Sequence, residues 1–132
     1  KRDTSPGRSR DNVLQSLYEI ELSGSSAQEI LKDLSLQSRY PHFKDLLKGV
    51  VDSKEDIDNT LSEFMERDLS SLDPIERSAL RLAAYEMLFT DTDVPIIINE
   101  SIRLSKKYGA ADGHKYVNAV LDKMYKSNFQ NI

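Results

Sequence analysis

The chain has 132 residues, a formal net charge of −4 and no cysteine, and 39% of its residues are hydrophobic. This length suits one domain or two small bundles that share a core, and the lack of cysteine excludes disulfides, thiolate zinc sites and cysteine nucleophiles. No apolar run approaches the roughly 18 residues of a membrane span, and the start carries no secretory signal pattern. We therefore expect a soluble cytoplasmic protein with no membrane partner.

Basic residues gather at both ends of the chain. Residues 1–10 contain four basic residues and one acidic residue, and residues 106–132 contain five lysines and two acidic residues. The stretch between them holds 9 basic and 19 acidic residues. If the two ends meet in the fold, they form one positive patch on an acidic body, which is typical of a protein that binds an anion on one face. The alternative is that basic ends only add solubility.

The chain begins with a segment that predicts a flexible basic arm, residues 1–9, because it lacks periodic apolar positions. A helix should follow from about Arg8 or Arg10 and end near Gly24. Its apolar residues recur at nearly helical spacing: Val13, Leu14, Leu17, Ile20 and Leu22.

Two further helices are expected before the middle of the chain. Ser26 followed by Glu29 forms a capping-box pattern and predicts the start of a short second helix. Residues 35–40 read as a loop. Residues 41–65 keep an i, i+3, i+4, i+7 apolar rhythm, which predicts one long third helix.

The second half of the chain predicts three more helices. Asp73 and Pro74 are typical of an N-cap and a first helical residue, and the helix that follows is apolar over most of its circumference as far as Phe89. Residues 95–108 predict the next helix, although residues 96–98 are three isoleucines with β propensity. A last helix should begin after the stop at Gly109, with Asp112 as its N-cap and Val117, Val120, Leu121 and Met124 facing inward.

These elements predict an all-α protein of six to seven helices. We expect one helical domain over residues 10–132, with sub-bundles at about 10–66 and 73–127, after the arm of residues 1–9.

The pattern favours a binding protein over an enzyme. The only histidines, His42 and His114, lie in different predicted helices and in no motif with a serine, and the five glycines are isolated. Nucleophilic catalysis, zinc coordination and a phosphate-cradling loop all need groupings that the sequence does not offer. We therefore expect no catalytic residue, no metal ligand and no cofactor.

Five segments, in order over nearly the whole chain, resemble the NusB family. They read RDNVLQSLYEIEL (10–22), FKDLLKGV (43–50), LSSLDPIERSALRLAAYEMLF (69–89), NESIRLSKKYG (99–109) and DGHKYVNAVLDK (112–123). The resemblance implies two packed three-helix bundles. It also implies a transcription antitermination factor that binds boxA-type RNA in nascent ribosomal transcripts. Its implied partners are NusE, a small-subunit ribosomal protein, and the RNA polymerase complex with other Nus factors. The resemblance implies no catalysis and no cofactor.

The resemblance also implies an RNA site. Arg8 and Arg10 match arginines that contact RNA in the family, and Tyr116 matches an aromatic that lies against it. Cations beside aromatic rings are typical of single-strand recognition, since bases stack on the rings and phosphates meet the cations. The predicted RNA-binding residues are Arg8, Arg10, Tyr18, Tyr108, Asp112, His114, Lys115 and Tyr116. The alternatives are core packing for Tyr18 and Tyr108 and helix capping for Asp112.

The fourth predicted helix carries the residues that we assign to the NusE partner. Glu76 matches a family glutamate that pairs with a basic residue of NusE, and its alternative is an acid in the first helical turn that stabilises its own helix. Arg81 and Glu86 follow on the same helix. Asn118, in the last helix, is expected to be a buried hydrogen-bonding residue rather than a group that reads a base.

Other functions of such a bundle stay open. NusB-like bundles also occur in RNA-modifying methyltransferases, and an adaptor that binds only protein is a further alternative. The chain ends at Ile132, soon after the last predicted helix, which favours a free-standing factor. Two copies could also associate through an exposed apolar patch.

Overall fold

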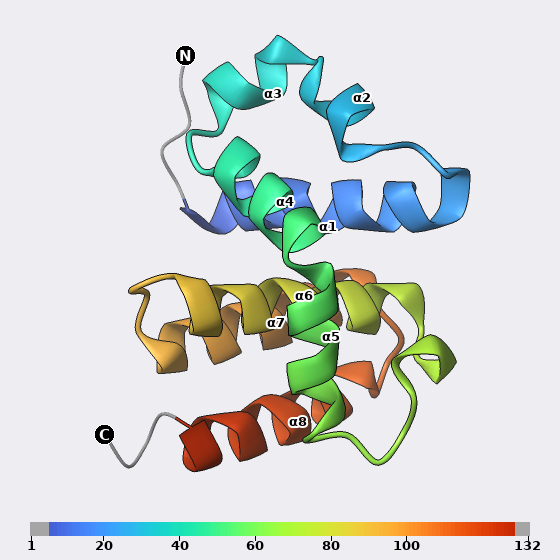
Figure 1. Cartoon of the computed structure of the whole chain (residues 1–132), viewed down its shortest axis with the longest axis vertical. Coiled ribbons are helices and arrows are strands. Elements are labelled where there is room, and N and C mark those ends of the chain that lie inside the picture. The colour runs from blue at the N-terminus through green and yellow to red at the C-terminus, as the bar shows by residue number, and fades with distance from the viewer. Residues whose placement is uncertain (1–5, 129–132) are drawn as a thin grey trace. The chain divides into compact units, whose positions relative to one another are not determined.

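The computed structural model describes residues 6–128, and those residues form α-helices and one 3-10 turn with no β-strand (Figure 1). The all-α prediction is confirmed, with eight α-helices in the described part of the chain rather than six or seven. The elements are α1 (Pro6–Ser23), α2 (Ala27–Leu31), α3 (Leu34–Arg39), α4 (Phe43–Asp52), α5 (Lys54–Ser62), η1 (Leu69–Ser71), α6 (Pro74–Phe89), α7 (Val94–Tyr108) and α8 (Gly113–Asn128).

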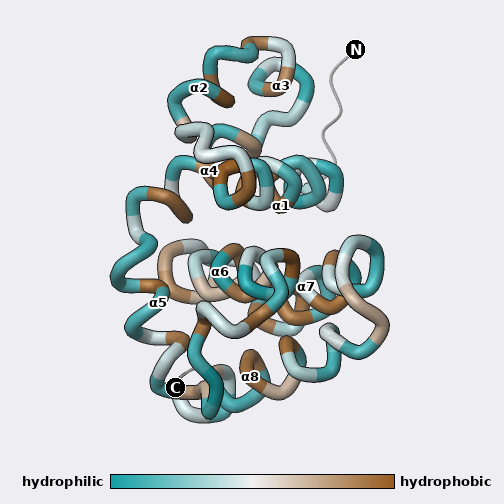
Figure 2. The backbone as a smooth tube through the Cα atoms, turned by 90° about the vertical axis from the view of Figure 1, so that its right-hand side faces the viewer, coloured by the Kyte–Doolittle hydropathy of each residue, from teal (hydrophilic) through white to brown (hydrophobic). Residues whose placement is uncertain are grey.

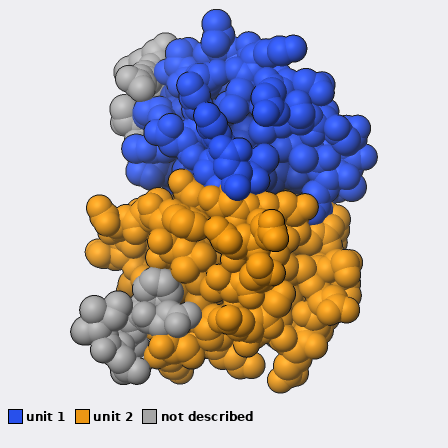
Figure 3. Space-filling view, in the orientation of Figure 1, with its two compact units in different colours: residues 1–52 blue, residues 53–132 orange. Residues whose placement is uncertain are grey.

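The chain divides into two compact units, residues 1–52 and residues 53–132 (Figure 3). Unit 1 holds α1 to α4, and unit 2 holds α5 to α8. The sequence placed the division between residues 66 and 73, so the observed division comes earlier.

In unit 1, α1 and α4 pack against each other, and α2 contacts both. The core is built from the predicted apolar positions: Val13, Leu14, Leu17, Phe43, Leu47 and Val50 are buried. The far end of the α1 stripe departs from the prediction, because Leu22 is 60% exposed.

The first helix begins earlier than predicted. It starts at Pro6, so residues 6–9, which the sequence assigned to a flexible arm, form its first turn. Proline suits this position because the first helical N–H has no partner in the helix. The side-chain amide of Asn12 donates to the carbonyl oxygen of Arg8 (2.9 Å) and supports the turn. The remaining arm residues, 1–5, lie outside the described residues.

The connection between α2 and α4 contains a helix that the sequence missed. Ser26 caps α2 as predicted, because its hydroxyl accepts a hydrogen bond from the Glu29 amide (3.1 Å). Residues 34–39, most of the expected loop, form α3 instead, and Asp33 supplies its cap by accepting from the Ser35 amide (3.0 Å). No residue of α3 is buried. The helix therefore shows no apolar rhythm from which it could be predicted.

The predicted long helix of residues 41–65 is wrong. The chain forms α4 as far as Asp52 and α5 from Lys54, with a break at Ser53, and Phe64 and Met65 lie beyond the end of α5. Residues 52–56 are all polar, so no apolar side chain holds a continuous helix against a core at that point.

Unit 2 is built around α6, which contacts α5, α7 and α8. Asp73 caps this helix by accepting from the Ile75 amide (2.9 Å), with Pro74 in its first turn, as predicted. Figure 2 shows apolar residues along α6 and α7. The apolar surface of α6 is not covered along its whole length, because Phe89, its last residue, is 50% exposed.

The three isoleucines at 96–98 lie in α7, which confirms the helix prediction. Ser101 fixes α7 to α6 by donating to the Ala79 carbonyl oxygen (3.2 Å). α7 ends at Tyr108 and Gly109 follows it as the C-cap, where the stop was expected, but this glycine has a φ of −100° and does not adopt the left-handed conformation of the predicted stop.

Candidate RNA-binding turn between α7 and α8

The turn between α7 and α8 brings together the predicted RNA-binding residues of unit 2. Tyr108 is the last residue of α7, and Lys115 and Tyr116 lie in the first turn of α8. Lys115 is exposed and its Nζ lies 3.2 Å from the Asp112 carboxylate. The turn thus presents cations and aromatic rings within one short segment, which suits contact with a single-stranded nucleic acid.

The aromatic residues of this turn are half-buried, and each carries a cation over its ring. Lys107 Nζ lies 5.2 Å from the centroid of Tyr108, and the guanidinium carbon of Arg67 lies 5.3 Å from that of Tyr116. Both distances fall within the range of cation–π attraction. The Tyr116 hydroxyl is buried and has no hydrogen-bond partner within the described residues. The polar end of this tyrosine therefore points away from solvent.

His114 is half-buried rather than presented on the surface. Its Nδ1 atom is enclosed and finds no hydrogen-bond partner in the described part of the chain. Lys115 is the more accessible of the two adjacent residues, with 72% of its side chain exposed.

A buried carboxylate lies beneath the turn. Glu76, in the first turn of α6, is only 6% exposed. A Cβ at Gly109 would lie 2.5 Å from Glu76 Oε2 and 2.8 Å from the Ser105 carbonyl oxygen, and a Cβ at Gly113 would lie closer still to the Glu76 carboxyl group. A side chain at Gly109 would therefore clash with the backbone, and one at Gly113 would force the Glu76 side chain to shift. Burial raises the pKa of the Glu76 carboxyl, and the Asp73 carboxylate raises it further.

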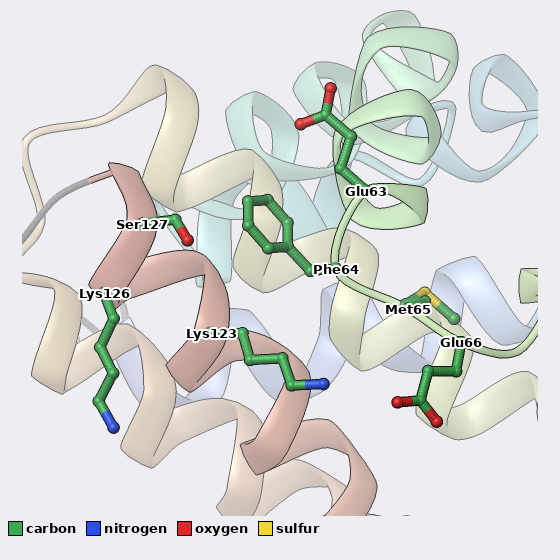
Figure 4. A pocket seen from close by; sticks show the side chains of 7 residues that line it. All are labelled: Glu63, Phe64, Met65, Glu66, Lys123, Lys126 and Ser127. Atoms are coloured by element: carbon green, nitrogen blue, oxygen red, sulfur yellow. The ribbon is translucent and has the colours of Figure 1, made fainter.

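A groove of about 460 Å³ runs between the segment after α5 and the last turns of α8 (Figure 4). One wall holds Phe64 and Met65 between the carboxylates of Glu63 and Glu66. The opposite wall is made by Lys123, Lys126 and Ser127 of α8. Of these two lysines, Lys126 is the one engaged in an ion pair, with Asp122 at 2.9 Å.

The remaining predicted RNA-binding residues belong to unit 1. On α1, Arg8 is exposed and Tyr18 is 37% exposed. Arg10 is only 6% exposed. This burial favours Arg8 over Arg10 as the guanidinium that meets a ligand directly.

The residues predicted to meet NusE do not form an exposed surface. Glu76 and Glu86 are 6% and 3% exposed, and the Arg81 side chain is 12% exposed. Arg81 binds Asp58 of α5 through two hydrogen bonds. These positions favour structural roles within unit 2 over direct contact with a partner.

Sequence reasoning missed Arg67 and misplaced Asn118. Arg67 lies in the segment between α5 and η1, far from Tyr116 along the chain, and no local pattern marks it. Asn118 was expected to be buried, but it lies on the exposed side of α8. The adjacent Val117 is buried, so these two neighbours lie on different sides of α8.

Two further properties concern the described residues as a whole. No group of three or more His, Cys, Asp or Glu side chains in residues 6–128 could hold a metal ion. Over the same residues, no helix is both long enough and apolar enough to span a bilayer.

The fold and the turn define an all-helical protein with a basic and aromatic segment at the junction of its last two helices. A sequence model of the NusB family matches residues 7–126. The transcription antitermination protein NusB of Nitrosomonas eutropha is 42% identical over 125 residues, which cover 88% of this chain and 73% of that protein. The chain therefore belongs to the NusB family.

Solved structures agree with this assignment. NusB of T. maritima superposes with a TM-score of 0.82 at 28% identity, covering 95% of this chain and 94% of that one. A chain from a crystal structure of the antitermination factors NusB and NusE in complex with dsRNA superposes with a TM-score of 0.80 at 27% identity. That match covers 91% of this chain and 95% of the other.

Proposed function

We propose that this chain is a transcription antitermination factor that binds boxA-type single-stranded RNA in nascent ribosomal transcripts. It acts together with NusE and joins the RNA polymerase complex with other Nus factors. The observation that carries the proposal is the match to proteins named for antitermination over 88% of this chain. The solved complex of NusB and NusE with dsRNA supports NusE and an RNA as the partners.

The α7–α8 turn supplies the chemistry that the proposal needs. Lys115 offers an exposed cation to a phosphate, and the rings of Tyr108 and Tyr116 lie within a few residues of it. Arg8 of α1 offers a second exposed cation. Phosphate contacts fix the position of a strand, and the bases supply the sequence information.

NusE fits the charge of this chain. The stretch of residues 11–105 carries 19 acidic and 9 basic side chains, which is complementary to a basic ribosomal protein. The role is that of a binding factor: the RNA-binding side chains position a strand and catalyse no reaction. Because it works on nascent transcripts, we place the protein in the cytoplasm.

Fluorescence anisotropy with a labelled boxA RNA and a scrambled control tests this function. The measurement is made at about 50 and 200 mM salt, with and without purified NusE. We expect a preference for boxA that strengthens with NusE and weakens at the higher salt, because binding releases counterions from the phosphates. Equal, weak binding of both RNAs under all conditions would overturn the proposal.

Two variants connect the expected binding to the turn. Lys115→Ala removes an exposed cation from the first turn of α8 and should weaken boxA binding and lower the salt dependence. Lys54→Ala is the matched control, since Lys54 is also exposed in the first turn of a unit 2 helix, α5, but lies outside the α7–α8 turn and outside the groove. The control should bind as the unaltered protein does.

A further inference from the structure

The guanidinium of Arg67 lies over the ring of Tyr116, 5.3 Å from its centroid. Arg67 Nη2 donates to the Ser71 carbonyl oxygen (3.2 Å), which ties the side chain to the 3-10 turn that follows it. The Tyr116 hydroxyl is buried, so Arg67 meets the ring of Tyr116 and not its hydroxyl group. The pair joins two segments of unit 2 that are distant in sequence.

This arrangement changes which group a base meets first. One side of the Tyr116 ring is already occupied, and Arg67 is exposed while Tyr116 is half-buried. A guanidinium is planar and stacks on aromatic rings, and RNA bases stack on arginine planes as they do on aromatic side chains. Arg67 is therefore the more accessible member of the pair, and its guanidinium can receive a base while Tyr116 stays beneath it.

We propose that Arg67 is the residue that contacts an RNA base at this site, and that Tyr116 is a positioning residue that acts through it. The inference rests on the proposed function, because it names a contact within the RNA complex. It assigns Tyr116 an indirect role in place of the direct stacking expected from the sequence.

The charges beside Arg67 favour stacking over a phosphate contact. Glu66 and Asp68 flank it in the sequence, and both are exposed. Two carboxylates next to one guanidinium weaken its attraction for a phosphate. Loss of Arg67 should therefore reduce affinity with little change in the salt dependence of binding.

The groove in Figure 4 gives the strand room to continue beyond this base. Its first wall, Glu63 to Glu66, ends one residue before Arg67. Its second wall includes Lys123, which follows Tyr116 by seven residues and so lies on the same side of α8. An exposed lysine two turns along α8 can meet the phosphate of a nucleotide next to the stacked base.

A double-mutant cycle tests the proposal, with the full chain and NusE on boxA RNA. The variants are Arg67→Ala, Tyr116→Ala, the pair together, and Arg67→Lys. Each single alanine variant should weaken binding about ten-fold. The double variant should bind RNA no more weakly than the weaker-binding of the two single variants does, because both residues serve one contact. Lysine should not restore binding, since an ammonium group has no plane on which a base can stack.

Arg39→Ala is the matched control, because Arg39 lies over the Tyr40 ring at 5.6 Å in unit 1. It should leave RNA affinity unchanged. RNAs with 2-aminopurine at successive positions supply a second measurement: at one position the fluorescence of the complex should differ between the unaltered protein and Arg67→Ala, and it should not change with Arg39→Ala.

Each other outcome is decisive. If Arg67→Ala binds as well as the unaltered protein or better while Tyr116→Ala is weakened, the base stacks on Tyr116 directly and the inference is wrong. If the unaltered protein shows no preference for boxA, the proposed function fails instead. Thermal melts show whether each variant still folds. If Arg67→Ala does not, Arg67→Gln, which keeps a donor for the Ser71 carbonyl, takes its place and tests whether the base stacks on Arg67 or on Tyr116.

Discussion

Arg81 of α6 binds Asp58 of α5 through two hydrogen bonds, from Nε to Oδ1 at 2.8 Å and from Nη2 to Oδ2 at 3.0 Å. The arginine and aspartate side chains are 12% and 26% exposed. A two-pronged pair of this kind fixes both the distance and the orientation of the two helices in unit 2. The pair leaves 12% of the Arg81 side chain exposed, and the contact of Arg81 with NusE stays a prediction.

Loss of this pair should destabilise unit 2. Asp58→Ala removes the carboxylate from a half-buried arginine, and we expect the free energy of unfolding to fall by about 1–2 kcal/mol, between the values for exposed and buried pairs. Urea unfolding measures the change. Asp56→Ala is the control, because Asp56 is exposed on the same helix. A loss at position 58 no larger than that of the control would contradict the structural role of the pair.

The close contact between Glu76 and the α7–α8 turn predicts a coupled pair of substitutions. Gly113→Ala places a Cβ against the buried Glu76 carboxyl group and should cost about 1–3 kcal/mol of stability through overpacking. Glu76→Ala makes room for that Cβ. The double variant should therefore be more stable than the sum of the two single changes indicates, as chemical denaturation can measure. Purely additive effects would show that the two residues do not meet.

The environment of Glu76 also predicts a pH dependence. Burial, with the Asp73 carboxylate adding to it, raises the pKa of Glu76 above its ordinary value of 4.5. The folded state thus holds the proton more tightly than the unfolded chain. This contribution to stability is complete below the ordinary pKa and is lost as the pH rises through the raised value. The difference in stability between the protein and Glu76→Gln should change in this window, and a constant difference from pH 4 to 7 would argue against it.

Asp112 should restrain RNA binding. Its exposed carboxylate lies in the turn and pairs with Lys115 at 3.2 Å, so it both repels phosphates and engages a cation that could meet them. Asp112→Asn should raise RNA affinity by up to about five-fold, with the largest effect at low salt. Asp56→Asn, which removes an exposed carboxylate of α5 outside the turn and the groove, is the control. Equal gains at both positions would point to net charge alone.

Where local chemistry determines an element, the sequence was a sufficient guide. Ser26 and Asp73 cap their helices through hydrogen bonds to residues two or three positions away, so their roles could be predicted. The break at Ser53 was not predicted, because residues 43–51 and 57–65 each keep an apolar rhythm and the polar run 52–56 between them also suits the solvated face of one long helix.

The candidate site was predictable to the extent that it is local. Tyr108 to Tyr116 are close in sequence, so a single turn had to bring them together. Arg67 reaches Tyr116 only through the folding of unit 2, and it left no pattern in the sequence. The burial of Glu76 likewise depends on the approach of Gly109 and Gly113 from another pair of helices.

Transcription in vitro tests the central claim most directly. A template carries a ribosomal leader with boxA upstream of a terminator, and read-through is measured with RNA polymerase, NusE and the other Nus factors. Adding this protein should increase read-through on that template and not on one with a scrambled boxA, and Lys115→Ala should reduce the gain. Read-through that is unchanged by the protein, or raised equally on both templates, would contradict the account.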